Sequence, residues 1–304
     1  MSTCLVGSEM CIRDSNAATE QKDEKKSIVQ VVIHSFFVIP FIISIFAVMV
    51  FLMIRILTSE PNTARDFLED VKIGGVTKRW QGAFELSKLL SNPKMVPKDD
   101  SFVNEMINTF EYYSNDKDDR IRQYLALAMG ATKDKRYINT LINGLSGANE
   151  GVIQACAFAL GNIGDERAVN SLVDLLKSND AQSRLHSVMA LGKIGTNSTN
   201  EPLRTMLYDT EPNVRWDAAI GLAKQKDMSS RTILMDLLDR EYLNSFSNLD
   251  EKERVQIILV AIKVSHHVEN EDLMRILEGL KTSDPNLKIR EAARSELEKF
   301  TIKN

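Results

Sequence analysis

One stretch of seven residues decides the fold: Ala159-Leu160-Gly161-Asn162-Ile163-Gly164-Asp165. Its pattern returns every 31 residues, as Ala128-Met129-Gly130 with Asp134, Ala190-Leu191-Gly192 with Thr196, and Gly221-Leu222-Ala223 with Asp227. A second register with the same spacing runs through Arg122, Ile153, Arg184 and Arg215. A repeat this short cannot bury its apolar face alone, so neighbouring units must stack into one continuous core. The sequence therefore predicts an all-α solenoid over residues 65–304.

Each repeat is predicted to consist of two helices joined by a short turn. In the second helix, small or apolar residues follow the arginine at three, four and seven places, as Ala218, Ala219 and Leu222 follow Arg215. These positions share one helical face. The first helices, near 168–177, 201–208 and 231–239, have the apolar spacing of amphipathic helices. The pattern predicts about seven repeats.

Two further features of the repeats predict local structure. The glycines of the breaks between helices are expected to end those helices in the left-handed conformation; they are Gly161, Gly164, Gly192 and Gly195. An aspartate also lies six residues before the arginine of several second helices, at Asp116, Asp209 and Asp284. Such a carboxylate is expected to cap the turn and to pair with that arginine.

These motifs resemble the HEAT-repeat superfamily, and in particular the short bacterial repeats named after phycobilisome lyases. The likeness rests on the spacing from aspartate to Val-Arg, on the paired small residues, and on the stretch 159–165, and it covers about residues 65–300. It departs from the family at Ile153, which replaces the arginine. The resemblance implies a right-handed α-solenoid that serves as a scaffold or binding surface, and it transfers no activity.

The first part of the chain differs from the repeats. Residues 5–15 resemble a translated transposase adapter from sequencing-library preparation, so we expect 1–15 to be non-native and exclude it from fold reasoning. Residues 16–27 form a short charged tail. No formal charge occurs among the 24 residues 31–54, which exceeds the roughly 20 that cross a bilayer as a helix. The sequence predicts a transmembrane helix at 28–57, followed by a linker at 58–64.

A bilayer anchor of this kind predicts a single-pass protein of the bacterial inner membrane. Its orientation depends on flanking positive charges, and these are balanced: Lys22, Lys25 and Lys26 precede the span, while Arg55, Arg65 and Lys72 follow it. The tight lysine cluster favours a cytoplasmic tail, with the solenoid outside the membrane. The opposite orientation stays open.

The sequence gives no reason to expect catalysis, a metal or a cofactor. Gly74-Gly75 lacks the continuation of a phosphate loop, and the adjacent His266 and His267 cannot face one site from one helix. Cys156 occupies a small-residue position and is expected to be a buried hydrophobe. Residues 61–304 hold 33 Lys plus Arg against 36 Asp plus Glu, a net charge of −3. That balance argues against a nucleic-acid groove.

One column of the second helices departs from the family pattern. The fifth residue after the arginine, usually polar in these repeats, is apolar here, and at 100° per residue it lies opposite the core. The first residue after the arginine adds further apolar side chains. An exposed apolar strip of several hundred Å² marks an interaction site. The predicted partner-binding residues are Trp80, Phe84, Leu127, Phe158, Leu185, Met189, Trp216, Ile220 and Leu259. Alternatively, close stacking buries this column as ordinary core.

The favoured hypothesis is a non-enzymatic, membrane-anchored scaffold that binds a protein partner, possibly another membrane protein, along its concave face. The bilayer would contact residues 28–57. The alternative is a lyase-like or enzyme-accessory protein that handles a tetrapyrrole or another ligand, which requires a pocket with polar or acidic groups. A purely structural role would leave the apolar column buried.

Overall fold

The computed structural model describes residues 32, 36, 38–58, 63–113, 118–147, 149–268 and 270–301, and every regular element in these residues is helical. Contacts divide the chain into two units, Met1–Pro61 and Asn62–Asn304. The division lies within the predicted linker. Residues 1–15 and 16–27, predicted to be an adapter-derived segment and a charged tail, lie outside the described residues.

The first unit contains one helix with printed bounds, α2 (Ile39–Thr58). Its described side chains are mostly apolar and exposed on all sides, as Phe41, Phe46 and Phe51 show. Among the described residues, no helix is both long and apolar enough to cross a membrane. The structure therefore does not support the transmembrane helix predicted at 28–57. The first residues of that prediction lie outside the described part of the chain.

The second unit is a stack of helix pairs. The seven pairs are α3 with α4, α5 with α6, α7 with α8, α9 with α10, α11 with α12, α13 with α15, and α16 with α17. These pairs match the predicted number of repeats. The bounds are α3 (Ala64–Ile73), α4 (Val76–Leu90), α5 (Asp100–Tyr112), α6 (Asp119–Thr132), α7 (Ile138–Gly144), α8 (Glu150–Ile163), α9 (Val169–Leu175), α10 (Ala181–Ile194), α11 (Asn197–Met206), α12 (Pro212–Lys224), α13 (Arg231–Leu238), α14 (Arg240–Asn244), α15 (Glu251–Ser265), α16 (Glu271–Ser283) and α17 (Leu287–Thr301).

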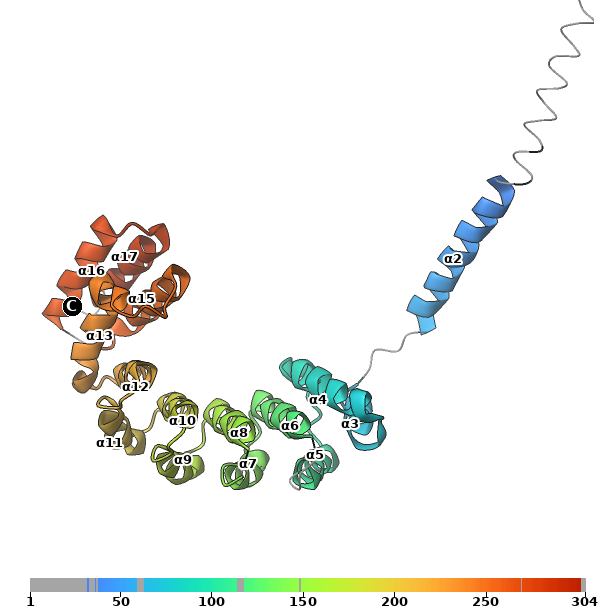
Figure 1. Cartoon of the computed structure of the whole chain (residues 1–304), viewed down its shortest axis with the longest axis horizontal. Helices are drawn as coiled ribbons and strands as arrows, with labels where there is room; N and C mark the ends of the chain where they lie inside the picture. Colours follow the sequence, from blue (N-terminus) through green and yellow to red (C-terminus); the bar gives the residue numbers. More distant parts are fainter. Residues whose placement is uncertain are drawn as a thin grey trace, which may run out of the picture. The chain divides into compact units, whose positions relative to one another are not determined.

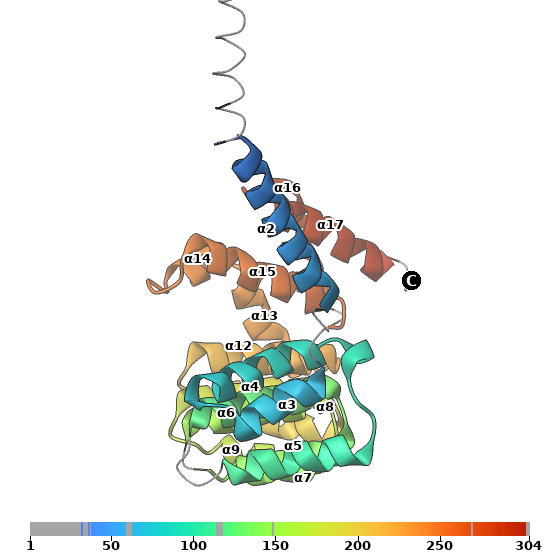
Figure 2. The same cartoon turned by 90° about the vertical axis from the view of Figure 1, so that its right-hand side faces the viewer.

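The helices of the unit form two layers. Figure 1 shows α4, α6, α8, α10 and α12 in one curved row, with α5, α7, α9 and α11 in a second row outside it. The view turned by 90° separates the same two rows (Figure 2). We call the first row the inner layer and its solvent-facing surface the inner face. Short 3-10 turns enter several outer helices, at Lys135–Tyr137, Glu166–Ala168 and Met228–Ser230.

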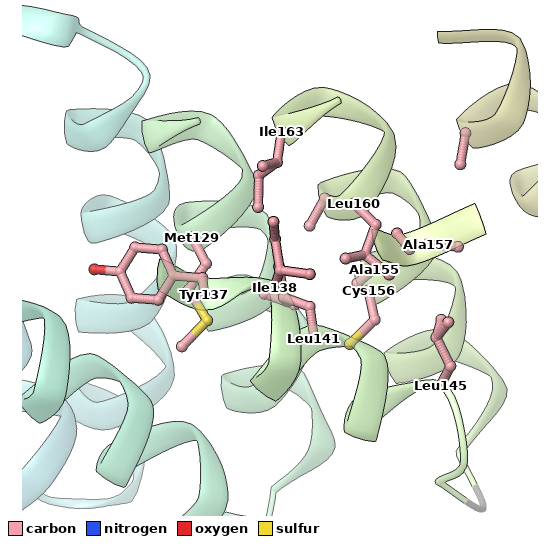
Figure 3. Packing of buried hydrophobic residues seen from close by; sticks show 14 of the residues in the cluster. Met129, Tyr137, Ile138, Leu141, Leu145, Ala155, Cys156, Ala157, Leu160 and Ile163 are labelled. Carbon is pink, nitrogen blue, oxygen red and sulfur yellow. The ribbon is translucent and has the colours of Figure 1, made fainter. Parts of the chain in front are cut away.

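The core lies between the two layers. Ile138 and Leu141 of α7 lie toward Cys156 and Leu160 of α8, whereas the ring of Tyr137, from the turn before α7, points away from them (Figure 3). All five side chains are buried, and burial raises the pKa of the Cys156 thiol to about 12. The prediction that Cys156 is a buried small hydrophobe is confirmed.

Glycines of the inner layer set how closely its helices stack. A Cβ on Gly130 would lie 2.5 Å from the Cα of Ala159, and one on Gly161 would lie 2.7 Å from the Cα of Ala190. The repeating small residues therefore bring helix backbones into direct contact. The prediction that Gly161 and Gly192 end helices is wrong, because both lie inside α8 and α10 at these contacts. Gly164 and Gly195 do end those helices in the left-handed conformation, with φ of 72° and 64°.

Substituting Gly161 with valine is expected to lower the free energy of unfolding by about 2–3 kcal/mol, because the new side chain must push α8 and α10 apart. Urea unfolding followed by circular dichroism measures the change. Gly279→Val is the matched control, since a Cβ on Gly279 meets no atom within 4 Å. Equal stability of the two variants would mean that α8 and α10 separate without cost.

The aspartates before the second helices connect neighbouring repeats. The backbone oxygen of Asp209 accepts a hydrogen bond from Arg215 Nη1 at 2.7 Å, while its carboxylate pairs with Arg184 of the preceding repeat. Asp284 repeats this arrangement, with Arg290 on its backbone oxygen and Arg240 on its carboxylate. The prediction that these carboxylates pair with the arginine six residues later is therefore wrong. They pair with an arginine earlier in the chain. Asp116 lies outside the described residues.

Candidate functional site

The inner face holds the apolar column predicted as a binding surface, and the column is half-buried. Phe84 is the most exposed member at 37%, and Trp216 is the least at 6%. The other members lie between these limits: Trp80, Leu127, Phe158, Leu185, Met189, Ile220 and Leu259. Trp80, Leu127 and Leu185 pack against the large core cluster, and Ile220 and Leu259 pack against the C-terminal one. The column is neither a free ridge nor a closed core.

Trp216 is the member whose position the sequence predicts least well. Its indole Nε1 donates a hydrogen bond to Tyr242 Oη at 3.3 Å, and its ring meets Phe246 edge to face at 5.1 Å. Both partners come from α14 and the residues just after it. The extra helix covers one side of Trp216, which explains its low exposure.

Leu127 and Phe158 line a pocket of about 460 Å³ on α4, α6 and α8. Polar side chains complete its wall: Ser87, Lys88, Ser91, Lys133 and Asn162. We call it the first pocket. The ammonium of Lys193 lies 4.2 Å from the centroid of the Phe158 ring and donates to Asn162 Oδ1 at 2.9 Å. Burial, together with the charge of Lys224, lowers the pKa of Lys193.

Leu185, Trp216 and Ile220 line another pocket, of about 330 Å³, which we call the second pocket. It lies where α10 and α12 meet α13 and α15, and its wall also includes Asn213, Asp217, Leu237, Gln256, Ile257 and Val260. A cavity of this size is at the lower end of the range for ligand pockets. The structure therefore gathers five of the nine predicted residues into two pockets.

The remaining predicted residues line neither of these two pockets. Phe84 packs edge to face on Tyr124 with ring centroids 5.4 Å apart, and Trp80 lies 5.4 Å below the guanidinium of Arg120. Leu259 packs against the C-terminal core cluster, and Met189 is half-buried on α10. These residues extend the apolar surface between and beyond the pockets.

Asp217 is the functional candidate that sequence reasoning missed. It lies in the wall of the second pocket, and burial raises the pKa of its carboxyl to about 6. Lys224 of the same helix and His186 of α10 oppose that shift through their charge. The available signal was positional: Asp217 follows Arg215 by two residues, next to the apolar column on the helical wheel. The sequence could not indicate how deeply it is buried.

Comparisons with known proteins agree with this architecture. The family model for HEAT repeats matches residues 109–186 and 175–243. One chain of the complex of CpcE and CpcF of phycocyanin lyase from Nostoc sp. PCC7120 is similar at 18% identity and a TM-score of 0.52, over 79% of this chain and 97% of that chain. YibA of Escherichia coli is 20% identical with a TM-score of 0.49, over 77% of this chain and 81% of that chain.

No curated protein matches the sequence significantly. The similarity to solved structures at this identity therefore concerns the fold, and it assigns no activity. The sequence match covers the regular part of the array, where the 31-residue register holds. Residues 109–243 match the model for HEAT repeats, and the helical unit that contains them has an α-solenoid fold similar to that of the phycocyanin lyase chain.

Proposed function

We propose that the protein is a non-enzymatic scaffold that binds a peptide segment of a protein partner on its inner face. The observation that carries this proposal is the pair of pockets on successive inner helices. Apolar side chains form much of each wall, and polar side chains complete it. Aromatic and apolar anchors surrounded by polar groups are the composition of protein interfaces.

The spacing of the inner helices suits an extended segment. Packed helices lie about 8–10 Å apart, and three residues of an extended chain cover a similar length at about 3.3 Å per residue. A segment that crosses α8, α10 and α12 would therefore place one anchor side chain at each helix. The half-buried column supplies sites for such anchors without exposing a wide apolar surface in the free protein.

The test is binding of peptides selected from a displayed library of random 12-residue sequences against the full-length protein. The double variant Leu127→Ser, Phe158→Ser removes the apolar floor of the first pocket and is expected to weaken binding of the selected peptides at least tenfold. Fluorescence anisotropy measures the affinity, and thermal unfolding confirms that the variant folds. Tyr208→Ser is the control, because this aromatic side chain is 87% exposed and lines neither pocket.

Unchanged affinity in the double variant, or a loss of equal size in the Tyr208 control, would contradict an inner-face site. A library that yields no binder at all would count against the proposal as a whole. Location in a membrane is not needed for any of these outcomes and stays a prediction of the sequence.

A second candidate function follows from Asp217. A lyase-like role requires a pocket with an acidic or polar group for a tetrapyrrole, and the second pocket contains one carboxyl among apolar walls. One of the solved structures with a similar fold is a chain of a phycocyanin lyase complex. Pigment that co-purifies with the protein and absorbs visible light would favour this role. Colourless protein that also fails to bind an added tetrapyrrole would exclude it.

A further inference from the structure

Asp217 is a carboxylate that the protein places in an apolar pocket without a partner. Of the described residues that line the second pocket, it is the only titratable one. Within the described part of the chain, no hydrogen bond or ion pair reaches its carboxylate. The side chain is half-buried, and only the charges of Lys224 and His186 oppose the effect of burial on its carboxyl. Holding a charge there opposes folding.

Other carboxylates of the same unit show the contrast. Asp209, in the turn between α11 and α12, is held by two hydrogen bonds from Arg184 and accepts the backbone N–H of Glu211. These donors lower the pKa of Asp209, whereas burial raises that of Asp217. Perturbed titratable groups in a cleft are candidates for function. The difference suggests that Asp217 acts on a ligand rather than on the fold.

We infer that the second pocket receives a basic side chain, lysine or arginine, from the peptide segment bound on the inner face. This inference rests on the proposed function and names the partner's chemistry. The apolar walls from Leu185 and Ile220 would pack against the aliphatic stem of that side chain. Its charged head would pair with Asp217 in a site of low dielectric, where the attraction is strong. Asn213 and Gln256 offer amide groups to the peptide backbone.

The lysines near the two pockets would favour an acidic ligand, which is the opposite of the basic side chain inferred here. Lys224 lies on the same helix as Asp217. Lys193 is close to Lys224, whose charge lowers the pKa of Lys193. Lys88 and Lys133 line the first pocket. If these lysines governed recognition, the partner would present acidic side chains. The two possibilities predict different sequences among selected peptides.

The experiment selects random 12-residue displayed peptides on full-length wild-type protein and on Asp217→Asn, which keeps the shape of the side chain and removes its charge. We expect wild-type binders to be enriched in lysine or arginine next to apolar residues. Those peptides should bind Asp217→Asn at least tenfold more weakly. Asp174→Asn is the matched control, since that carboxylate is 75% exposed on an outer helix and pairs with Lys177.

A double-mutant cycle then tests whether Asp217 and the basic residue of the peptide interact directly. Replacing the basic residue of a selected peptide with norleucine should weaken binding to wild type by a similar factor and should cost nothing further in Asp217→Asn. Binding to wild type should also weaken as the pH falls below about 6, where Asp217 gains a proton. The same pH series on His186→Gln removes the histidine's contribution to that profile.

Three outcomes would overturn the inference. The selected peptides could be acidic, or apolar without basic residues, or they could bind Asp217→Asn as tightly as wild type. In each case, loss of binding in the Leu127→Ser, Phe158→Ser variant would still uphold the inner-face site. Absence of any selected peptide would instead overturn the proposed function and this inference together.

Discussion

Replacing Asp209 with alanine is expected to lower the free energy of unfolding by about 3 kcal/mol, because it leaves the guanidinium of Arg184 buried without its anion. The two side chains are only 13% and 6% exposed, and their contact is bidentate, with distances of 2.8 and 2.9 Å. The pair joins α10 to the turn that precedes α12. Its loss therefore weakens the boundary between two repeats.

Urea unfolding at neutral pH measures this effect. Asp174→Ala provides the comparison, because its pair with Lys177 is exposed and such pairs contribute little. In a stack whose stability depends on contacts between neighbouring repeats, the Asp209 variant is also expected to unfold less cooperatively. A loss no larger than that of the Asp174 control would show that the Arg184 pair does not hold the repeats together.

The second large effect is a pH-dependent difference in stability between the wild type and Asp217→Asn. The pKa of Asp217 is about 6 in the folded protein, above the ordinary value of about 3.9. A raised acid pKa means that folding favours the protonated form. The stability from that preference is complete below about pH 4, and it is lost as the pH rises through about 6.

Two pKa units correspond to about 3 kcal/mol, so the variant should gain about 2–3 kcal/mol on the wild type between pH 4 and pH 7. Taking the difference at each pH cancels the other carboxylates, such as Asp209, whose lowered pKa makes them stabilise the fold as the pH rises. Chemical unfolding at four pH values measures the curve. A flat difference would show that Asp217 is as well solvated in the folded as in the unfolded protein.

The fold was predictable because stacking imposes a strict spacing on small residues. Gly130 packs against the backbone of Ala159, and Gly161 packs against the backbone of Ala190. Larger side chains are therefore excluded at these repeating positions. The same register did not reveal that Gly161 lies inside a helix and Gly164 ends it, since both are glycines in one short break. Only the helix geometry distinguishes close packing from a left-handed cap.

The candidate site was predictable in part. The register placed the apolar column on the inner face, and five of its members do line pockets. The burial of Trp216 was not predictable, because it depends on Tyr242 and Phe246, which lie between α13 and α15 outside the 31-residue register. Asp217 was missed for a related reason. The burial of its side chain depends on α13 and α15, which complete the second pocket. The 31-residue register does not define the position of these two helices.

Hydrogen exchange, read by mass spectrometry on the full-length protein with and without a selected peptide, tests the central claim most directly. If the inner face is the binding surface, short exchange times should show new protection in α8, α10 and α12. The outer helices α7, α9 and α11 should change little. Protection greatest in those outer helices, or absent from the inner ones at saturating peptide, would contradict the account.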